Sequence, residues 1–196
     1  MRDISKTRVM AGTAVLSAVA IILSYLEFTM PFSPAFAKMD FSDLPALLAA
    51  FAYGPMAGVM TELVKNLLHL TASATGGVGE LANFLIGASF VGTAGMIYQK
   101  SKSRKTALIG MLAGSFIMGI VAAMMNYFDL LPLYTAFMPM DEMIAAFAAF
   151  IPLIHSKLDV CIFSAFPTTV GKGIVVSAIA FALYKRLRPI LKGRSA

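Results

Sequence analysis

This chain has one cysteine, no tryptophan and few charged residues, and these features limit what kind of protein it can be. The one cysteine, Cys161, cannot form an internal disulfide or a cysteine-based metal site, and we expect it to be a packed apolar residue. With no tryptophan, an aromatic belt must come from Tyr and Phe. Charged residues make up 13% and apolar residues 59%, against roughly 25% and 45–50% in soluble domains. Strand-like alternation over regular segments is absent, which argues against an outer-membrane barrel. The composition therefore predicts an all-α polytopic membrane protein.

Catalytic motifs are missing as well. H-E-x-x-H, G-x-S-x-G and C-x-x-C do not occur, and Gly171-Lys172-Gly173 fails the frame of the P-loop. We therefore expect no catalytic residue, no metal site and no resident cofactor, and we do not expect an enzyme.

The length of the chain limits the number of membrane spans. At about 20 residues per span, 196 residues allow at most six or seven helices and no further soluble domain. Residues 1–196 are thus expected to form a single integral-membrane domain. The first apolar segment lacks a signal-peptide cleavage site and is expected to be a retained helix. Clear apolar segments are residues 9–26, 81–98, 107–125 and 165–184, and residues 41–71 could form one span or two.

Basic residues decide between these two possibilities. Cytoplasmic loops of membrane proteins carry an excess of Lys and Arg. All three basic clusters fall on one side only if the chain turns back at Gly54-Pro55, where proline disfavours a continuous helix. The sequence therefore predicts six transmembrane helices with cytoplasmic N- and C-termini. The clusters are Arg2, Lys6 and Arg8; Lys100, Lys102, Arg104 and Lys105; and Lys185, Arg186, Arg188, Lys192 and Arg194.

This topology places three connections outside: residues 28–42, 71–79 and 127–164. The last contains an apolar piece, residues 142–154, which is too short to span and is expected to be a surface helix or a lid over a cavity. Because the basic charge lies at helix ends, we expect contact with membrane lipid and not with nucleic acid.

Polar residues from several spans meet at the outer level. Glu62, Lys65, Asn66 and His69 share one helical face, since their spacing is i, i+3, i+4 and i+7. Ionisable groups at membrane depth usually line a site or a water-filled cavity. The pattern therefore predicts a polar site in the outer half of the bundle. Asn126 would close the fifth span on this side, and Thr169 and Lys172 would lie near the start of the sixth.

Each of these residues also has a structural alternative. Lys172 could reach the membrane surface instead of a pocket. Glu62 could form an internal ion pair with Lys65, and Asn66 and Asn126 could join helices. Other polar residues are expected to be structural, namely His69 and His155 at the interface and Ser42 or Asp43 as the cap of the second span.

The segments 38–69, 79–87, Asn126-Tyr127 and 166–173 (FPTTVGKG) resemble the substrate-binding S-components of energy-coupling-factor (ECF) vitamin importers, in particular riboflavin-specific members. The resemblance covers most of the chain. It implies a six-helix binding protein of the prokaryotic plasma membrane, which captures riboflavin as the transported substrate. It also implies docking on an ECF membrane scaffold subunit and two cytoplasmic ATPase subunits.

The same resemblance implies roles for individual residues. Asn126 and Lys172 match positions that hydrogen-bond the flavin ring. Thr169 stands where many riboflavin-specific members have Asn, and a hydroxyl replaces only one of the hydrogen bonds of an amide. The pocket would be completed by Met39, Asp40, Glu62, Asn66, Leu81 and Asn83.

Ala14 and Ala18 match the small-residue face that contacts the scaffold, and small residues at this spacing permit close helix approach. Gly54-x-x-x-Gly58 and Gly110-x-x-x-Gly114 have the same spacing. Other hypotheses remain open at this point: an S-component for FMN, a pterin, thiamine or biotin; an intramembrane enzyme using Asp40, Glu62 and His69; and a purely structural subunit.

Overall fold

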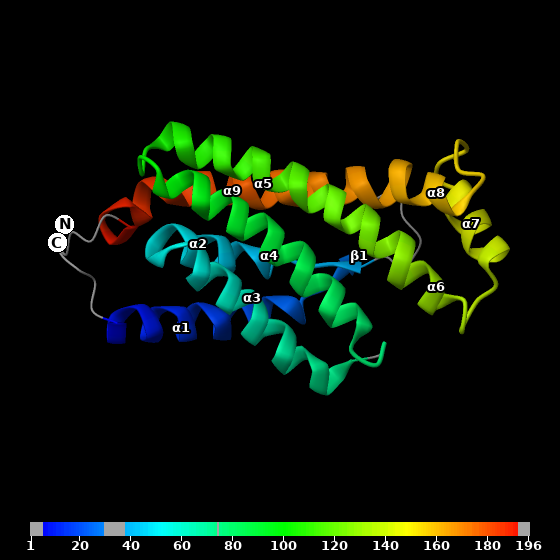
Figure 1. The fold of residues 1–196 in the computed structure, drawn as a ribbon, viewed down its shortest axis with the longest axis horizontal. Coiled ribbons are helices and arrows are strands. Elements are labelled where there is room, and N and C mark those ends of the chain that lie inside the picture. The colour runs from blue at the N-terminus through cyan, green and yellow to red at the C-terminus, as the bar shows by residue number, and fades with distance from the viewer. Residues whose placement is uncertain (1–5, 30–37, 74, 192–196) are drawn as a thin grey trace.

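The computed structural model describes residues 6–29, 38–73 and 75–191, and nearly all of this chain is helical (Figure 1). The hairpin of β1 and β2 pairs antiparallel, with Phe28 opposite Met39. In chain order the elements are α1 (Lys6–Ser24), β1 (Phe28–Thr29), β2 (Lys38–Met39), α2 (Asp43–Tyr53), α3 (Pro55–His69), the 3-10 turn η1 (Leu70–Ala72), α4 (Val78–Gln99), α5 (Arg104–Met125), the π-helical turn η2 (Asn126–Leu130), α6 (Leu131–Tyr134), α7 (Met140–Ala148), α8 (Lys157–Asp159), the π-helical turn η3 (Val160–Ala165) and α9 (Phe166–Leu191).

Within the residues that the structure describes, four helical segments are long and apolar enough to cross a membrane. They are Lys6–Ser24, Val78–Gln99, Arg104–Tyr134 and Lys157–Leu183. Large apolar side chains such as Met10, Phe116 and Ile174 are exposed on them, as expected of helices that face lipid. The prediction of a helical membrane protein is confirmed at this level. The helices α2 and α3 are shorter, with 11 and 15 residues.

The chain turns back at Gly54, where α2 ends and α3 begins with Pro55 (Figure 1). Gly54 has φ +109°, a left-handed conformation that residues with a Cβ rarely adopt. Its N–H still donates to the Ala50 carbonyl at 3.0 Å, which closes the last turn of α2. The break predicted from the Gly-Pro pair is therefore present.

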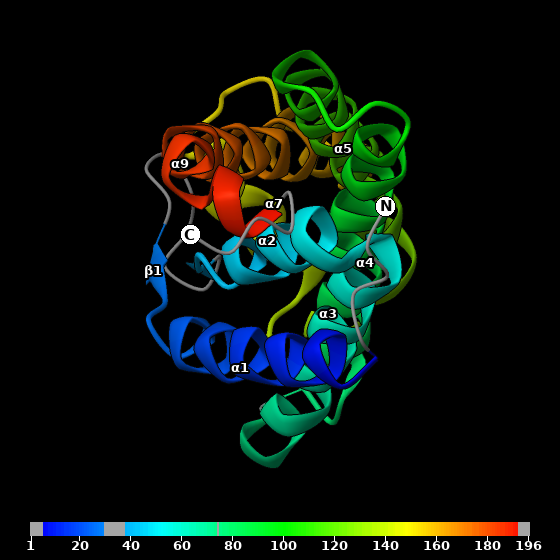
Figure 2. The same cartoon turned by 90° about the vertical axis from the view of Figure 1, so that its left-hand side faces the viewer.

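Helix α2 lies at the centre of the bundle (Figure 2). It contacts α1, α3, α4 and α9, and its Ala46, Leu47, Ala49 and Ala50 have no exposed surface. This burial explains how so short a helix can lie in a membrane protein, because the neighbouring helices cover it on all sides.

Small residues let the helices behind α2 approach one another closely. A Cβ on Gly110 of α5 would lie 2.7 Å from the Ala94 carbonyl of α4, and one on Gly114 would lie 2.7 Å from the Phe90 carbonyl. The close contact predicted from this spacing is present. The core beside it contains Phe90, Tyr98 and Met111.

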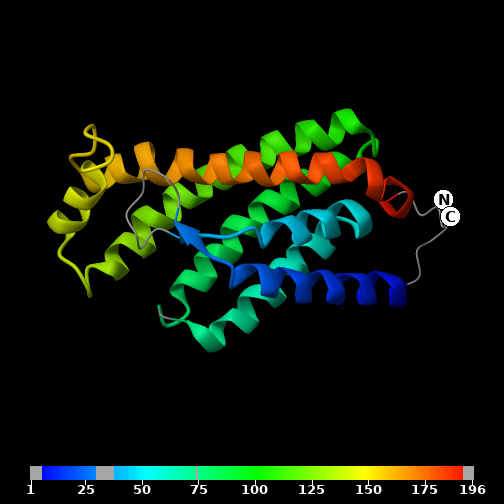
Figure 3. The same ribbon diagram turned by 180° about the vertical axis from the view of Figure 1, so that it is seen from behind.

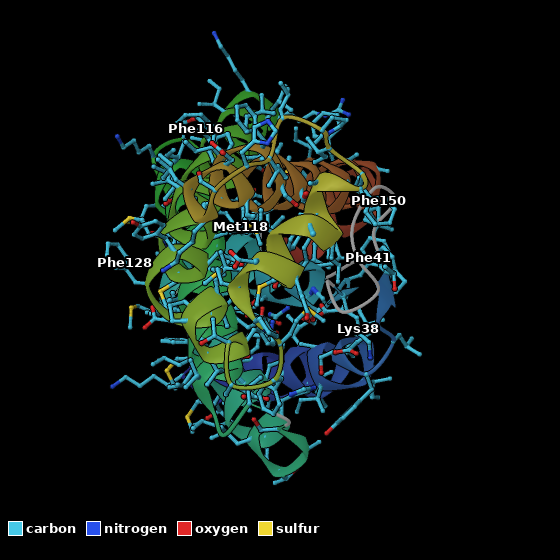
Figure 4. All side chains as sticks on the ribbon, turned by 90° about the vertical axis from the view of Figure 1, so that its right-hand side faces the viewer. Lys38, Phe41, Phe116, Met118, Phe128 and Phe150 are labelled. Atoms are coloured by element: carbon cyan, nitrogen blue, oxygen red, sulfur yellow. The ribbon has the colours of Figure 1, made fainter. Side chains whose placement is uncertain are left out.

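The two ends of the molecule differ in character. The start of α1, the α4–α5 turn and the last turns of α9 lie together at one end (Figures 1 and 3). These are the segments that carry the basic clusters, although Arg2, Lys192 and Arg194 lie outside the described residues. The β-hairpin, η1, α6, α7 and α8 lie at the opposite end, which Figure 4 views directly.

Helices at this second end are longer than the sequence predicts. The fifth helical segment does not close at Asn126 but continues to Tyr134, and the sixth begins at Lys157 instead of residue 165. Both continue through a π-helical turn, which has no clear sequence pattern. Within the predicted apolar piece 142–154, only the part up to Ala148 is helical, as α7. Its Met143 and Phe147 are buried against Leu131 and Val160, so α7 packs on the helix ends.

Candidate functional site

A cavity opens among the helices at the end that carries the β-hairpin. It has two adjoining compartments, of about 640 Å³ and about 200 Å³, whose walls share Lys38, Met39, Leu130 and Tyr134. Helices α4, α6 and α9 and the hairpin all contribute to these walls. Figure 4 shows Lys38 at this end, on the side of the molecule opposite Phe128.

The smaller compartment is lined by apolar surface with a few polar groups. Its polar residues include Asn126 of η2 and Thr168 and Thr169 of α9, and Phe147 of α7 is part of its apolar wall. The Asn126 Nδ2 donates to the Ala122 carbonyl at 2.8 Å, which fixes the side chain and leaves its Oδ1 as the acceptor for a further donor. This compartment suits a flat ring with a polar edge.

The larger compartment is polar. Asp40 follows β2, Asn83 comes from α4, and Lys172 comes from α9 one turn beyond Thr169. Residues three apart on a helix are neighbours on its surface. A ligand lying along α9 can therefore contact Thr169 in the smaller compartment and Lys172 in the larger one.

Hydrogen bonds hold the outer wall of the larger compartment. Glu80 of α4 accepts from Ser73 at 2.7 Å and from Thr75 at 3.3 Å, and lies 3.2 Å from the Nδ1 of His69. The His69 ring stacks on Tyr25, the residue that follows α1, with centroids 5.2 Å apart. His69 thus has the structural role expected of it, and it also lines the cavity.

A chain of buried charges runs behind this wall. The Nζ of Lys65 lies 2.6 Å from Glu62 Oε2, 2.9 Å from Ser42 Oγ and 3.2 Å from Asp43 Oδ1. All three are completely buried. The other oxygen of Asp43, Oδ2, lies 2.8 Å from the Nζ of Lys172. We refer to Asp40, Ser42, Asp43, Glu62, Lys65 and Lys172 as the buried charge network.

The network reaches the cavity through two of its members. Lys172 Nζ lies 3.8 Å from Asp40 Oδ1, and both residues line the larger compartment. Asp40 Oδ1 also accepts the backbone N–H of Ser42 at 2.6 Å. Lys172 does not extend to the membrane surface, since it is only 9% exposed and pairs with the carboxylates of Asp40 and Asp43.

The predicted cap of α2 needs correction. Ser42 is the residue before the helix, but its hydroxyl makes no capping hydrogen bond and instead accepts from Lys65. Asp43 is the first helical residue, and its carboxylate pairs with two lysines. Here buried ammonium groups take the oxygens that would otherwise cap the helix.

Six of the predicted ligand-binding residues line the cavity. Three that do not are Glu62, Asn66 and Leu81. A Cβ on Gly87 of α4 would lie 2.7 Å from Glu62 Cδ, so the Glu62 carboxylate points toward α4. Asn66 and the 55% exposed Leu81 instead border a separate crevice of about 130 Å³ between α3 and α4. The cavity-lining residues are Met39, Asp40, Asn83, Asn126, Thr169 and Lys172.

Several lining residues were not predicted. Leu130 comes from η2, Tyr134 from α6 and Phe147 from α7, all within residues 127–164, which the sequence predicted as an external connection. They are apolar or aromatic side chains in a chain full of such residues, so composition alone could not identify them.

A further groove on the molecule is apolar, in contrast to this cavity. It is an apolar groove of about 540 Å³ between α1 and α3, lined by Ala14, Ser17 and Ala18 on one side and by Met56 and Met60 on the other. Ala14 and Ala18 are exposed in it, so the two predicted scaffold-contact residues form an open surface of the isolated chain.

Within the described part of the chain, no group of three or more His, Cys, Asp or Glu side chains could hold a metal ion. The candidate site is thus the two-compartment cavity itself.

A helical membrane protein with a small-molecule cavity near one end is a binding or transport protein in its general class. Sequence comparison gives the family. The protein-family model described as "ECF transporter, substrate-specific component" matches residues 8–184, and the chain belongs to this family. Its members are transport components and not enzymes, which agrees with the missing catalytic motifs.

Individual relatives agree with this assignment. The chain is 41% identical over 180 residues to the riboflavin transporter RibU of Staphylococcus aureus, which covers 91% of this chain and 89% of that protein. It is 32% identical over 196 residues to the riboflavin transporter FmnP of Bacillus subtilis, covering 97% and 98%. A solved structure of the S component of a bacterial ECF transporter superposes with a TM-score of 0.75 at 38% identity, covering 96% of this chain and 99% of that one.

Proposed function

We propose that this protein is the riboflavin-binding S-component of an ECF-type importer in a prokaryotic plasma membrane. The observation that carries the proposal is the two-part cavity, with an apolar compartment suited to a flat ring and a polar compartment suited to a hydroxylated chain. Riboflavin is a molecule of this shape, and riboflavin transporters are among the relatives of the chain.

In this proposal the flavin ring lies along α9 in the apolar compartment, with its polar edge at the boundary with the polar compartment. Asn126 and Thr169 face its polar edge, and the ammonium of Lys172 donates to a ring carbonyl. Riboflavin has no carboxylate for Lys172 to neutralise, so Asp43 and Asp40 balance its charge instead. Met39, Asp40 and Asn83 border the remaining part of the ligand.

The residues Glu62, Asn66 and Leu81 take no direct part in this proposal. Thr169 in place of an amide means one hydrogen bond fewer to the ring edge. A related flavin such as FMN is therefore the next candidate ligand, ahead of a pterin, thiamine or biotin.

Six spans with both termini in the cytoplasm follow from the same proposal. Its support is the gathering of the helix ends that carry the basic clusters at one end of the molecule, with the cavity near the other. The cavity then faces outside, where α7 and the segment 28–42 would cover a bound ligand; residues 30–37 of that segment lie outside the described residues.

Release inward would require partners, since the chain has no P-loop of its own. We propose an ECF scaffold subunit that docks on the groove of Ala14 and Ala18, and two cytoplasmic ATPase subunits. The whole chain acts as one substrate-binding domain in this scheme.

The first test is an absorbance spectrum of the detergent-purified protein without added ligand. Flavin bands that are released on denaturation and identified by chromatography would establish a co-purified flavin. If the spectrum is clean, riboflavin is titrated and its fluorescence followed. Quenching is the expected result for an empty flavin site, whereas no response at any concentration would refute riboflavin as the substrate.

A further inference from the structure

Four members of the buried charge network line neither compartment, and one of them, Asp43, directly holds a residue that does. Asp43 and Lys65 are both completely buried and line neither compartment. Lys172, which does line the larger compartment, has its shortest ion pair with Asp43. The position of its ammonium therefore depends on a side chain behind the wall.

Asp43 acts as a bridge between two lysines. Its Oδ1 lies 3.2 Å from Lys65 and its Oδ2 lies 2.8 Å from Lys172, so each oxygen faces one ammonium. A carboxylate held at both oxygens cannot rotate without breaking one of the two pairs. The orientation of Asp43 is thus fixed by α3 on one side and α9 on the other.

Lys65 in turn is held by three acceptors. An ammonium has three donors, and Glu62, Ser42 and Asp43 each lie within hydrogen-bond distance of its Nζ. Lys65 therefore joins α3 to the start of α2 through two hydrogen bonds, to Ser42 and Asp43, and one ion pair with Glu62, which makes it a support for Asp43.

The same support reaches Asp40 by a shorter route. Ser42 donates its backbone N–H to Asp40 Oδ1 and accepts from Lys65 through its hydroxyl. Both members of the network that line the cavity, Asp40 and Lys172, are thus held by one set of buried contacts that link α2, α3 and α9.

We propose that Asp43, supported by Lys65, is a positioning residue for ligand binding: it sets where the Lys172 ammonium meets the ligand, without contacting the ligand itself. The inference rests on the proposed riboflavin site. Without Asp43, the one ion pair left to Lys172 among the described residues is with Asp40, whose oxygen is 3.8 Å away, and its ammonium is no longer held against the wall.

The test is a double-mutant cycle on the full-length, detergent-purified chain. Riboflavin dissociation constants are measured by fluorescence quenching for the wild type, Asp43→Asn, Lys172→Met and the double variant. Asp43→Asn should weaken binding by roughly tenfold, and the double variant should bind no more weakly than Lys172→Met alone. The visible spectrum of bound flavin should shift in the same direction in Asp43→Asn and Lys172→Met.

A purely structural role for Asp43 makes a different prediction. Its effect would then add fully to that of Lys172→Met, and the flavin spectrum would not change; either result would overturn the proposal. Met118→Ala is the matched control, since Met118 is a buried core residue of α5 that lines neither compartment. It should lower thermal stability without changing the bound-flavin spectrum.

A milder variant guards against misfolding of Asp43→Asn. Ser42→Ala removes one acceptor of Lys65 and keeps every charge of the network. It should weaken riboflavin binding less than Asp43→Asn does, and only when Lys172 is present; unchanged affinity would contradict the proposal. Failure of the wild type to bind riboflavin would refute the proposed function and this inference together, whereas normal wild-type binding with additive variants refutes the inference alone.

Discussion

Lys172 combines two properties that rarely occur together: it is nearly buried, and its charged end borders a cavity. We expect Lys172→Met to weaken riboflavin binding by about 1–3 kcal/mol, because the variant loses a charge-assisted hydrogen bond to the ligand. Titration of riboflavin fluorescence measures this change. Unchanged affinity would remove Lys172 from the site.

The same substitution should also lower the stability of the ligand-free protein. It leaves Asp43 Oδ2 buried with its strongest partner removed, and an uncompensated buried charge is costly. Lys172→Arg is the control, since it keeps the charge near Asp43 while changing the donor geometry at the ligand.

At the residue scale, the sequence predicted which side chains share a face but not what each face contacts. Glu62, Lys65 and Asn66 do lie on one side of α3, as their spacing requires. That side faces α2 and α4 for most of its length, and only His69 at its end reaches the cavity. The direction in which a helical face points depends on how the helices pack, which the spacing of residues within one helix does not contain.

At the element scale, the α2–α3 break depends on one glycine. Gly54→Ala should destabilise the protein by about 1–3 kcal/mol, because φ +109° is strained for any residue with a Cβ. The added Cβ would also lie 2.8 Å from the Gln99 Nε2. Thermal unfolding in detergent measures the effect.

Gly92→Ala provides the matched control on α4. A Cβ there would meet only Val59, at an ordinary 3.7 Å, and alanine favours a helix over glycine. This variant should be as stable as the wild type or more so. Equal losses in the two variants would mean that the backbone conformation at Gly54 is not the cause.

A second prediction at this scale concerns the groove between α1 and α3. Ala18→Phe should leave riboflavin binding unchanged and reduce uptake by the assembled transporter in proteoliposomes, because the larger side chain fills the groove proposed for the scaffold. Val15→Phe is the control, as Val15 is exposed on α1 but does not line the groove. Equal uptake by the two variants would place the scaffold contact elsewhere.

The elements themselves were predictable to different degrees. The break at Gly54-Pro55 has a local cause in two adjacent residues, so the sequence contains it. The extension of the fifth helical segment beyond Asn126 does not have such a cause, since it depends on a π-helical turn. The wall residues Leu130 and Tyr134 lie on this extension, and for that reason part of the cavity was missed.

At the scale of the whole molecule, the proposed topology can be tested with single cysteines. Cys161 is the only cysteine and is 2% exposed, so Cys161→Ala gives a background without reactive thiols. In intact cells, Phe137→Cys should react with a membrane-impermeant maleimide, because Phe137 is 74% exposed at the cavity end. Ser101→Cys, in the α4–α5 turn, should react only after the membrane is opened. The opposite pattern would contradict cytoplasmic termini.

The overall class and the arrangement of the ends were within reach of the sequence. Hydropathy and the placement of basic residues are properties of whole segments, so they average over many residues and tolerate errors at individual positions. The buried charge network is the reverse case. It depends on distances between atoms of three separate segments, and only the folded chain brings these together.

The two π-helical turns have a consequence for how such a site can change. Each is closed by a hydrogen bond between residues five apart, from Leu131 to Asn126 and from Phe166 to Cys161, so each contains one residue more than an α-helical turn of equal reach. One residue corresponds to a rotation of about 100° in an α-helix. Deleting a residue within η2 would therefore rotate α6 and carry Tyr134 out of the cavity wall, while α5 keeps its packing. Insertion or deletion of one residue in these turns can therefore change the shape of the cavity, in addition to substitution of its lining side chains.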